Sequence, residues 1–292
     1  MLEWHNIIFY LVFTGQILLI SGYFARKVHS RMTYVLEHYP ADQYPKLYPR
    51  PVEYYRIGHA LFRFATRAIM LLGFVILGLV MFVVDHASFA NDGYISEFWP
   101  AAYGMIQMIP MAVLEFSEVN QLKKMRELNL ASTRTAQLQP RSVFQFVSPW
   151  LLATAVGLVI ATIVIDFYLA DFAISSETVP QTLLILAANG LFAYLGVRAL
   201  YGPKQNPHQS HADRNHQIRV NLRSFINISM AGSAFLLIQS LREVFPMAFL
   251  DAVVMSLYFQ AIVVFSIGYL LQHIKIEDVD FTVYREIETA GA

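Results

Sequence analysis

Two carboxylates one helical turn apart are the residues of this chain whose spacing points most directly to chemistry. Glu115 and Glu118 follow an apolar stretch, and residues three apart lie on the same face of a helix. Partial burial of such a pair would raise the pKa of one carboxyl, so the pair could bind a cation or relay a proton. Two alternatives stay open: the pair faces Arg198 at the end of another apolar stretch, or both carboxylates reach water at the membrane surface.

Polar and helix-breaking residues interrupt three of the apolar stretches. In lipid, a polar side chain is costly unless it faces another helix or a cavity, and a proline frees a backbone carbonyl that can line such a cavity. The candidates for lining a polar cavity are Gln107 and Pro110 in one stretch, Asn189 in a second and Asn227 in a third. The alternative is hydrogen bonding between helices, which would close the bundle without a cavity.

Three histidines of one polar loop have a spacing that could hold a divalent metal ion. His208, His211 and His216 form the pattern H-x2-H-x4-H, and neutral imidazole is a common metal ligand. The preceding residues, Pro203 to Pro207, form a polar loop without a helical face to orient ligands. A solvated loop is therefore the favoured interpretation, and no cofactor is expected.

Missing residues and motifs exclude several classes of protein. The chain of 292 residues has no cysteine, so it is not a disulfide-stapled domain, a zinc ribbon, a thiol enzyme or an iron–sulfur protein. It also lacks H-E-x-x-H, P-loop and dinucleotide-binding motifs, and its last apolar stretch has no lysine for a retinal Schiff base. An enzyme is therefore the less favoured class, although lipid-modifying enzymes often have short signatures.

Seven apolar segments must position these candidate residues. The chain is 56% hydrophobic and only 14% charged, with a mean hydropathy of +0.46, whereas about 25% charged residues are typical of soluble domains. A bilayer core about 30 Å thick needs roughly 17–25 apolar residues in a helix. Spans are predicted at 7–25, 68–84, 98–114, 147–165, 181–200, 225–241 and 249–271. The expected fold is an all-α, polytopic membrane helix bundle forming one domain, 1–274, with a short tail, 275–292.

The first long loop, 26–67, contains four prolines within 12 residues, which prevent a continuous helix there. The residues after these prolines, 52–67, place apolar and basic side chains on separate helical faces. We therefore predict an amphipathic helix lying on the membrane surface. Residues 115–130 contain no proline or glycine and are predicted to extend the third span as a charged helix.

The distribution of basic residues predicts the orientation. Twenty of the 21 Lys and Arg residues lie in the loops 26–67, 115–146 and 201–224, in the tail, or at Arg198 beside the third loop. Because cationic loops stay in the cytoplasm, the N-terminus is predicted outside and the C-terminus inside, in a bacterial inner (plasma) membrane. The remaining basic residue, Arg242, is predicted to pair with Asp251 across the last outer hairpin.

Small residues four apart predict two faces for helix packing. Ala153, Gly157 and Ala161 lie on the fourth span, and Ser229 and Ser233 lie on the sixth. Such faces let another helix backbone approach closely.

Three functions are compatible with these features. The first is a small-solute or ion transporter with a polar cavity among the third, fifth and sixth spans. The second is a non-catalytic scaffold or sensor whose cytoplasmic loops bind a partner protein or anionic lipid. The third is an enzyme that modifies a lipid at the cytoplasmic interface. Membrane lipid is an expected partner, a homo-oligomer is left open, and nucleic acid is not expected because the basic residues are spread over several loops.

Overall fold

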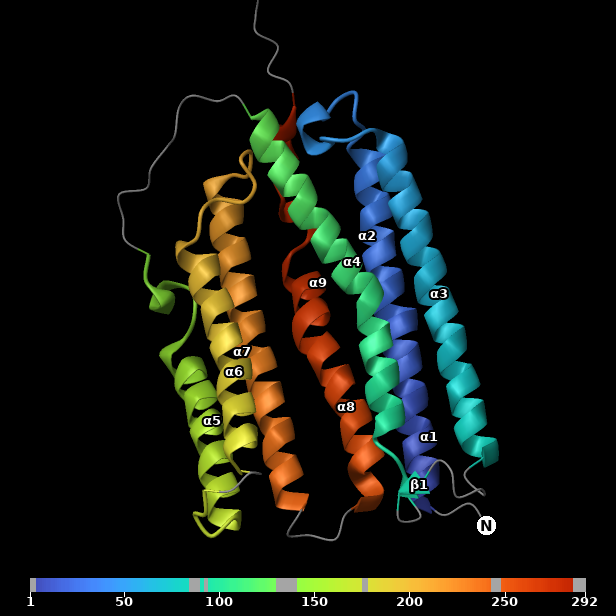
Figure 1. Cartoon of the computed structure of the whole chain (residues 1–292). Helices are drawn as coiled ribbons and strands as arrows, with labels where there is room; N and C mark the ends of the chain where they lie inside the picture. The colour runs from blue at the N-terminus through green and yellow to red at the C-terminus, as the bar shows by residue number, and fades with distance from the viewer. Residues whose placement is uncertain are drawn as a thin grey trace, which may run out of the picture.

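The computed structural model describes residues 4–83, 90–91, 94–129, 141–174, 178–242 and 248–285. Long helices that run side by side make up these residues (Figure 1). The strands of the described part are β1 (Ala90–Asn91) and β2 (Tyr94–Ile95), which form a small antiparallel hairpin. The expected all-α class is therefore confirmed.

Seven helical rods account for most of the described residues. Two rods contain a π-helical segment: the first joins α1 (Trp4–Gln16), η1 (Ile17–Phe24) and α2 (Ala25–His38), and the last joins α8 (Asp251–Val263), η5 (Val264–Gly268) and α9 (Tyr269–His273). The other rods are α3 (Val52–Val83), α4 (Phe98–Leu128), α5 (Pro149–Leu169), α6 (Thr178–Tyr201) and α7 (His211–Arg242). The described loops contain the short 3-10 segments η2 (Pro45–Leu47), η3 (Val143–Gln145), η4 (Ala248–Leu250), η6 (Ile276–Asp278) and η7 (Phe281–Tyr284).

Six of the described rods are long and apolar enough to cross a membrane, which supports an integral membrane protein. Each overlaps one predicted span. The rod that does not qualify is α4, whose first part, predicted as the span 98–114, contains Pro100, Tyr103, Gln107 and Pro110. These residues lower its apolar content, so length and composition alone do not confirm the predicted count of seven.

The prediction of a surface helix over residues 52–67 is wrong. These residues form the first half of α3, which continues without interruption into the predicted second span. The physical reason is that α3 contains no proline between Val52 and Val83. The backbone hydrogen bonds of the helix therefore continue past Arg67. The proline-rich segment before Val52 does separate two helices, as expected, and α4 continues as a charged extension to Leu128.

The rods form two groups (Figure 1). We call α5, α6 and α7 the three-helix group, because α7 packs closely on both α5 and α6. We call the first rod, α3, α4 and the last rod the four-rod group, in which α1 and α4 both pack on α8. Packing of α7 against α8 and η5 joins the two groups.

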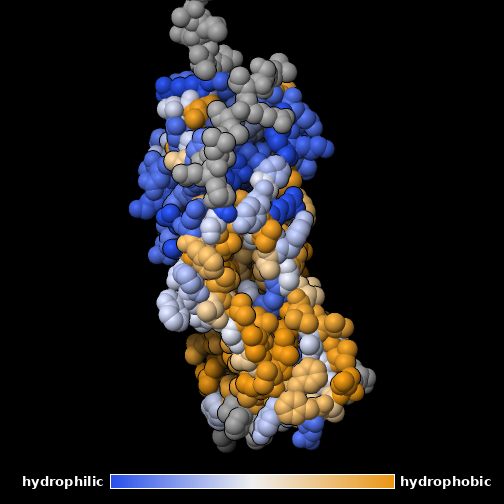
Figure 2. Space-filling view, turned by 90° about the vertical axis from the view of Figure 1, so that its left-hand side faces the viewer, coloured by the Kyte–Doolittle hydropathy of each residue, from blue (hydrophilic) through white to orange (hydrophobic). Residues whose placement is uncertain are grey.

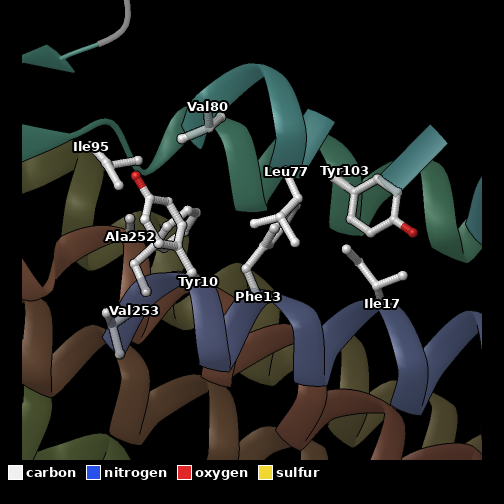
Figure 3. Packing of buried hydrophobic residues seen from close by; sticks show 10 residues of the cluster. Tyr10, Phe13, Ile17, Leu77, Val80, Ile95, Tyr103, Ala252 and Val253 are labelled. Carbon is white, nitrogen blue, oxygen red and sulfur yellow. The ribbon is translucent and has the colours of Figure 1, made fainter. Parts of the chain in front are cut away.

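The largest buried cluster lies within the four-rod group (Figure 3). Phe13 of α1 stacks on Phe9, with ring centroids 5.3 Å apart, and meets the edge of the Tyr103 ring at 5.4 Å. Tyr103 also donates a hydrogen bond of 3.0 Å to the Ile69 carbonyl of α3. Its hydroxyl lies so close to Gly73 that a Cβ there would be 2.3 Å away, so the absence of a side chain at Gly73 lets α3 and α4 approach.

The two ends of the bundle differ in character. We call one end the long-loop end, because it carries the loops 39–51, 141–148 and 202–210 and the tail 274–285 (Figure 1). The opposite, short-loop end carries the start of α1, the β-hairpin and η4. Figure 2 shows hydrophilic residues gathered at the long-loop end and hydrophobic residues over much of the other half. This polarity agrees with a bundle that leaves a membrane at its long-loop end.

The tail crosses the long-loop end and connects the two groups. The Phe281 ring stacks on Tyr39, with centroids 3.7 Å apart, and Arg285 donates a 2.8 Å hydrogen bond to the Tyr44 hydroxyl. On the other side, Asn206 donates a 2.6 Å hydrogen bond to the hydroxyl of Tyr284. The tail therefore holds the first loop to the third.

Candidate functional site

A cavity of about 590 Å³ lies at the long-loop end of the four-rod group. Its apolar lining residues are Val28, Met32, Val35, Leu36, Leu47, Met111, Leu114, Ile267, Leu270, Leu271, Ile274 and Ile276. Its polar lining residues are Arg31, Tyr48, Tyr55, His59, Glu115, Ser117, Glu118 and Gln121. The volume is in the range of small-molecule sites, which combine apolar walls with a few polar groups.

The cavity exists because α4 separates from the last rod. α4 packs closely on α8, whereas few contacts join its charged extension to α9. The extension is instead tied to α3, where the Tyr54 and Ser117 hydroxyls are 3.2 Å apart in a hydrogen bond. The space between α2, α3, the extension of α4 and α9 therefore remains open at the depth where the predicted spans end.

Polar bonds hold the wall of the cavity on two sides. The Arg31 guanidinium donates a hydrogen bond to the carbonyl of Ile274, the residue that ends α9. The Tyr48 hydroxyl donates a 2.7 Å hydrogen bond to the Tyr39 carbonyl, which fastens the proline-rich loop to the end of α2. Burial and the neighbouring Tyr55 raise the pKa of Tyr48 to about 12, so its hydroxyl stays protonated and keeps donating.

The carboxylate pair borders this cavity. Glu115 and Glu118 both line it, and both side chains are exposed. Partial loss of water around the Glu118 carboxyl, together with the charge of Glu115 one turn away, raises the pKa of Glu118. The site therefore combines an apolar compartment with a carboxylate that would gain from a cation or a proton.

Arg198 is not brought to this pair. It lies on α6 in the three-helix group, and no ion pair joins it to either glutamate among the residues that the structure describes. The histidine that lines the cavity is His59 of α3, and none of His208, His211 and His216 does so.

Gln107 lies inside the four-rod group, at some distance along the helix from the carboxylates. It is 4% exposed, its side-chain carbonyl accepts a 3.0 Å hydrogen bond from Gln16, and its amide donates one of 2.9 Å to Ser21. Pro110 is also buried on α4. Neither residue lines the cavity.

Asn189 lies in the other group, between α6 and α7. Its amide donates to the Ile185 carbonyl at 2.9 Å and to Ser233 at 3.2 Å, and its side-chain carbonyl accepts a hydrogen bond from Ser229. Asn227 is half-buried on α7. The candidates for a single polar cavity are thus divided between two helix groups.

The small residues of α5 and α7 have different surroundings. Ser229 and Ser233 face α6 through their bonds to Asn189. Ala153 and Gly157 are exposed, Ala161 is half-buried, and no atom lies within 4 Å of a Cβ built at Gly157. Within the described chain, this part of the α5 stripe does not pack on another helix.

The three histidines that were candidate metal ligands have separate surroundings. The His208 ring lies 6.1 Å from the Tyr284 ring, and His216 is hydrogen bonded to the His273 carbonyl at 2.7 Å, while His211 is exposed at the start of α7. Burial and two nearby lysines lower the pKa of His208. The described residues contain no group of three or more His, Asp or Glu side chains placed to hold a metal ion.

The structure also places Arg242 and Asp251 in an ion pair between α7 and α8. The sequence patterns did not indicate Arg31, His59 or Asp166 as candidate functional residues. A signal for His59 was present, since it lies four residues after Tyr55 on one helical face. Asp166 lies one residue beyond the predicted fourth span, 147–165, and was therefore expected in the outer loop that follows. The structure instead buries it within α5.

No family model, curated protein or solved structure matches this chain, so its own residues must carry the functional argument.

Proposed function

We propose that this chain is a seven-span membrane protein whose long-loop end faces the cytoplasm, and that it binds a lipid of the cytoplasmic leaflet in the cavity. The cavity is the observation that carries the proposal. Most of its apolar side chains come from α2, α4 and the last rod, and most of its polar groups lie on the α4 extension and on α3. An acyl chain would lie on the former and a head group among the latter.

The depth of the cavity favours a lipid over a soluble ligand. Val28 and Met32 follow the predicted end of the first span by a few residues, and Ile267 and Leu271 belong to the last turns of the seventh. The cavity therefore lies at the predicted boundary between acyl chains and head groups, where amphipathic molecules are most stable.

The charges favour a head group with an amine. Glu115 and Glu118 are acidic, and among the described residues no ion pair joins either of them to a basic side chain. The guanidinium of Arg31 is already bonded to the Ile274 carbonyl. An ammonium group placed beside the two carboxylates would supply the missing positive charge.

The number of spans and the orientation rest on two features. α4 extends from the β-hairpin at the short-loop end to the long-loop end, as the other rods do (Figure 1). Among the residues that the structure describes, every basic residue except Arg242 belongs to the long-loop side, as positive-inside loops require. Of the three candidate functions, a lipid sensor agrees best with the cavity and its two carboxylates. A transporter is less favoured, because Gln107 and Asn189 are bonded to neighbouring side chains in separate helix groups.

Blocking the cavity tests the proposal. Met32→Trp would fill part of the cavity, whereas Tyr34→Trp introduces the same side chain at an exposed position of the same helix. We expect saturable binding of a fluorescent short-chain phosphatidylethanolamine to the detergent-solubilised wild type, at least about tenfold weaker binding to Met32→Trp, and unchanged binding to Tyr34→Trp. Equal binding to all three proteins, with thermal unfolding showing that each is folded, would refute a lipid site in this cavity.

The natural absence of cysteine allows a direct test of topology. Single cysteines at Glu97 and Glu127 flank α4, and we expect an impermeant maleimide to label Glu97→Cys in intact cells and Glu127→Cys only after the membrane is opened. Labelling of both from the same side would exclude α4 as a span.

A further inference from the structure

A buried carboxylate lies in the three-helix group, far along the chain from the cavity residues. Asp166 is on α5 near the short-loop end and is 8% exposed. Its Oδ1 accepts hydrogen bonds from Gln181 Nε2 of α6 at 2.7 Å and from Ser240 Oγ of α7 at 3.0 Å. Its Oδ2 is buried and has no hydrogen-bond partner. One oxygen thus fastens three helices together, and the other is left without a donor.

The charge of this carboxylate is not compensated by the protein. No basic side chain forms an ion pair with Asp166 in the part of the chain that the structure describes. Arg242, two residues after Ser240, is paired with Asp251. A charge buried within an apolar bundle is costly unless it is paired, and a carboxylate inside a membrane helix generally marks a functional site.

Two more buried oxygens without partners occur beside the groups that hold Asp166. Thr182 Oγ1 follows Gln181 on α6, and Gln239 Oε1 precedes Ser240 on α7. Thr182 lies seven residues before Asn189, which bonds to Ser233, so Thr182 belongs to the face of α6 that is turned toward α7. Gln239 lies four residues after Phe235, which stacks on Tyr258, so Gln239 belongs to the face of α7 that is turned toward α8 and away from Asp166. Oxygen ligands of this kind suit hard cations.

We propose that Asp166 anchors a binding site for one Na⁺ ion, with Oδ2 as the charged ligand and Thr182 Oγ1 as a further oxygen ligand from α6. A monovalent ion would neutralise the single carboxylate, whereas a divalent ion would leave a net positive charge among apolar side chains. The site lies in a different helix group from the cavity and does not depend on the proposed lipid binding.

Thermal unfolding of the detergent-solubilised full chain tests this site. At constant ionic strength, replacing choline chloride with NaCl raises the unfolding midpoint of the wild type by about 3 °C or more, with a saturable dependence on Na⁺. Asp166→Asn abolishes this response. Asp171→Asn, which makes the same change at an exposed carboxylate five residues further on, retains it.

Absence of a Na⁺ response in the wild type, or an equal response in Asp166→Asn, would overturn the proposal. So would a wild-type stability that depends on pH and not on Na⁺, with the dependence lost in Asp166→Asn, since the carboxyl would then hold a proton. If Asp166→Asn does not fold, Thr182→Val decides, with Gln239→Leu as the control on the face of α7 that is turned toward α8. Thr182→Val raises the half-saturating Na⁺ concentration about threefold or more and Gln239→Leu leaves it unchanged, and an unchanged value in Thr182→Val refutes the site.

Discussion

The two helix groups bury polar side chains in different ways. In the four-rod group, the neutral amides of Gln16 and Gln107 bond to each other and to Ser21. In the three-helix group, the Asp166 carboxylate accepts hydrogen bonds from the Gln181 amide and the Ser240 hydroxyl. Each network leaves one buried side-chain oxygen without a hydrogen-bond partner, Gln16 Oε1 in the first and Asp166 Oδ2 in the second, but only the second belongs to a carboxyl group.

The glycines show a second difference between the groups. In the four-rod group, a Cβ at Gly104 would lie 2.4 Å from the Phe259 ring, so α4 and α8 approach through the missing side chain. In the three-helix group, Gly157 and Gly190 have open space around them. A close approach at glycine therefore joins α4 to α8, whereas in the three-helix group Gly196 packs on Leu222 of α7 and the glycine positions Gly157 and Gly190 leave room for a side chain.

Gly104→Ala is expected to have the largest effect on this comparison. The added methyl group must displace an aromatic ring or separate α4 from α8, and overpacking of this kind costs about 1–3 kcal/mol or more. Gly157→Ala is the matched control, and we expect a gain of up to about 1 kcal/mol from helix propensity. Denaturant unfolding in detergent measures both, and equal effects would show that the two groups are packed alike.

Gln107→Leu is expected to cost about 1–3 kcal/mol, because it removes one of the two acceptors of the buried Gln16 amide and the donor to Ser21. The double variant Gln16→Leu/Gln107→Leu removes both amides and should recover part of this loss. The same unfolding measurement applies. A double variant as unstable as the sum of the two single variants would show that the amides do not stabilise each other.

Glu118→Gln is expected to have a smaller effect, which appears as a change in pH dependence. The folded-state pKa of Glu118 lies above its ordinary value of 4.5, so the folded chain favours the neutral carboxyl. Its contribution to stability is therefore complete below about pH 4.5 and is lost as the pH rises through the folded-state pKa. Between pH 4.5 and the folded-state pKa, Glu118→Gln should therefore lose less stability than the wild type. Identical dependence of stability on pH in the two proteins would contradict a raised pKa of Glu118.

Arg56→Ala is expected to have the smallest effect. Arg56 pairs with Glu53 at 3.7 Å on the surface of α3, and both side chains are more than two-thirds exposed. Exposed pairs contribute about 0–1 kcal/mol, so the free energy of unfolding should change by less than about 0.5 kcal/mol. A larger loss would mean that this part of α3 packs against something outside the chain.

Local composition made much of the fold predictable. Hydrophobic length identified six membrane-length helices, and the prolines of the first loop correctly separated α2 from α3. The surface helix over 52–67 was mispredicted, because an amphipathic pattern does not reveal whether a helix bends onto a surface or continues straight. The apolar content of α4 is too low for the same criterion to establish a seventh span.

The candidate site was predictable only where neighbouring residues in sequence are also neighbours in space. Spacing identified Glu115 and Glu118, since a helix places them one turn apart. Spacing could not show that Arg31 and His59 line the same cavity as the two glutamates. These residues come from α2 and α3, and the cavity forms only because the α4 extension separates from α9. Asp166 was predicted in a loop because a carboxylate near the end of an apolar stretch usually reaches water.

The sequence by itself determined the helical class, the apolar lengths and the separation of basic from acidic residues, because each depends on the local chain and its solvent. Tertiary structure decided which polar groups face a cavity, which face each other and which are left without a partner. Those outcomes depend on where rods diverge or close, and helix packing sets this through contacts between residues far apart in the chain, such as Gly104 with Phe259 and Asp166 with Ser240.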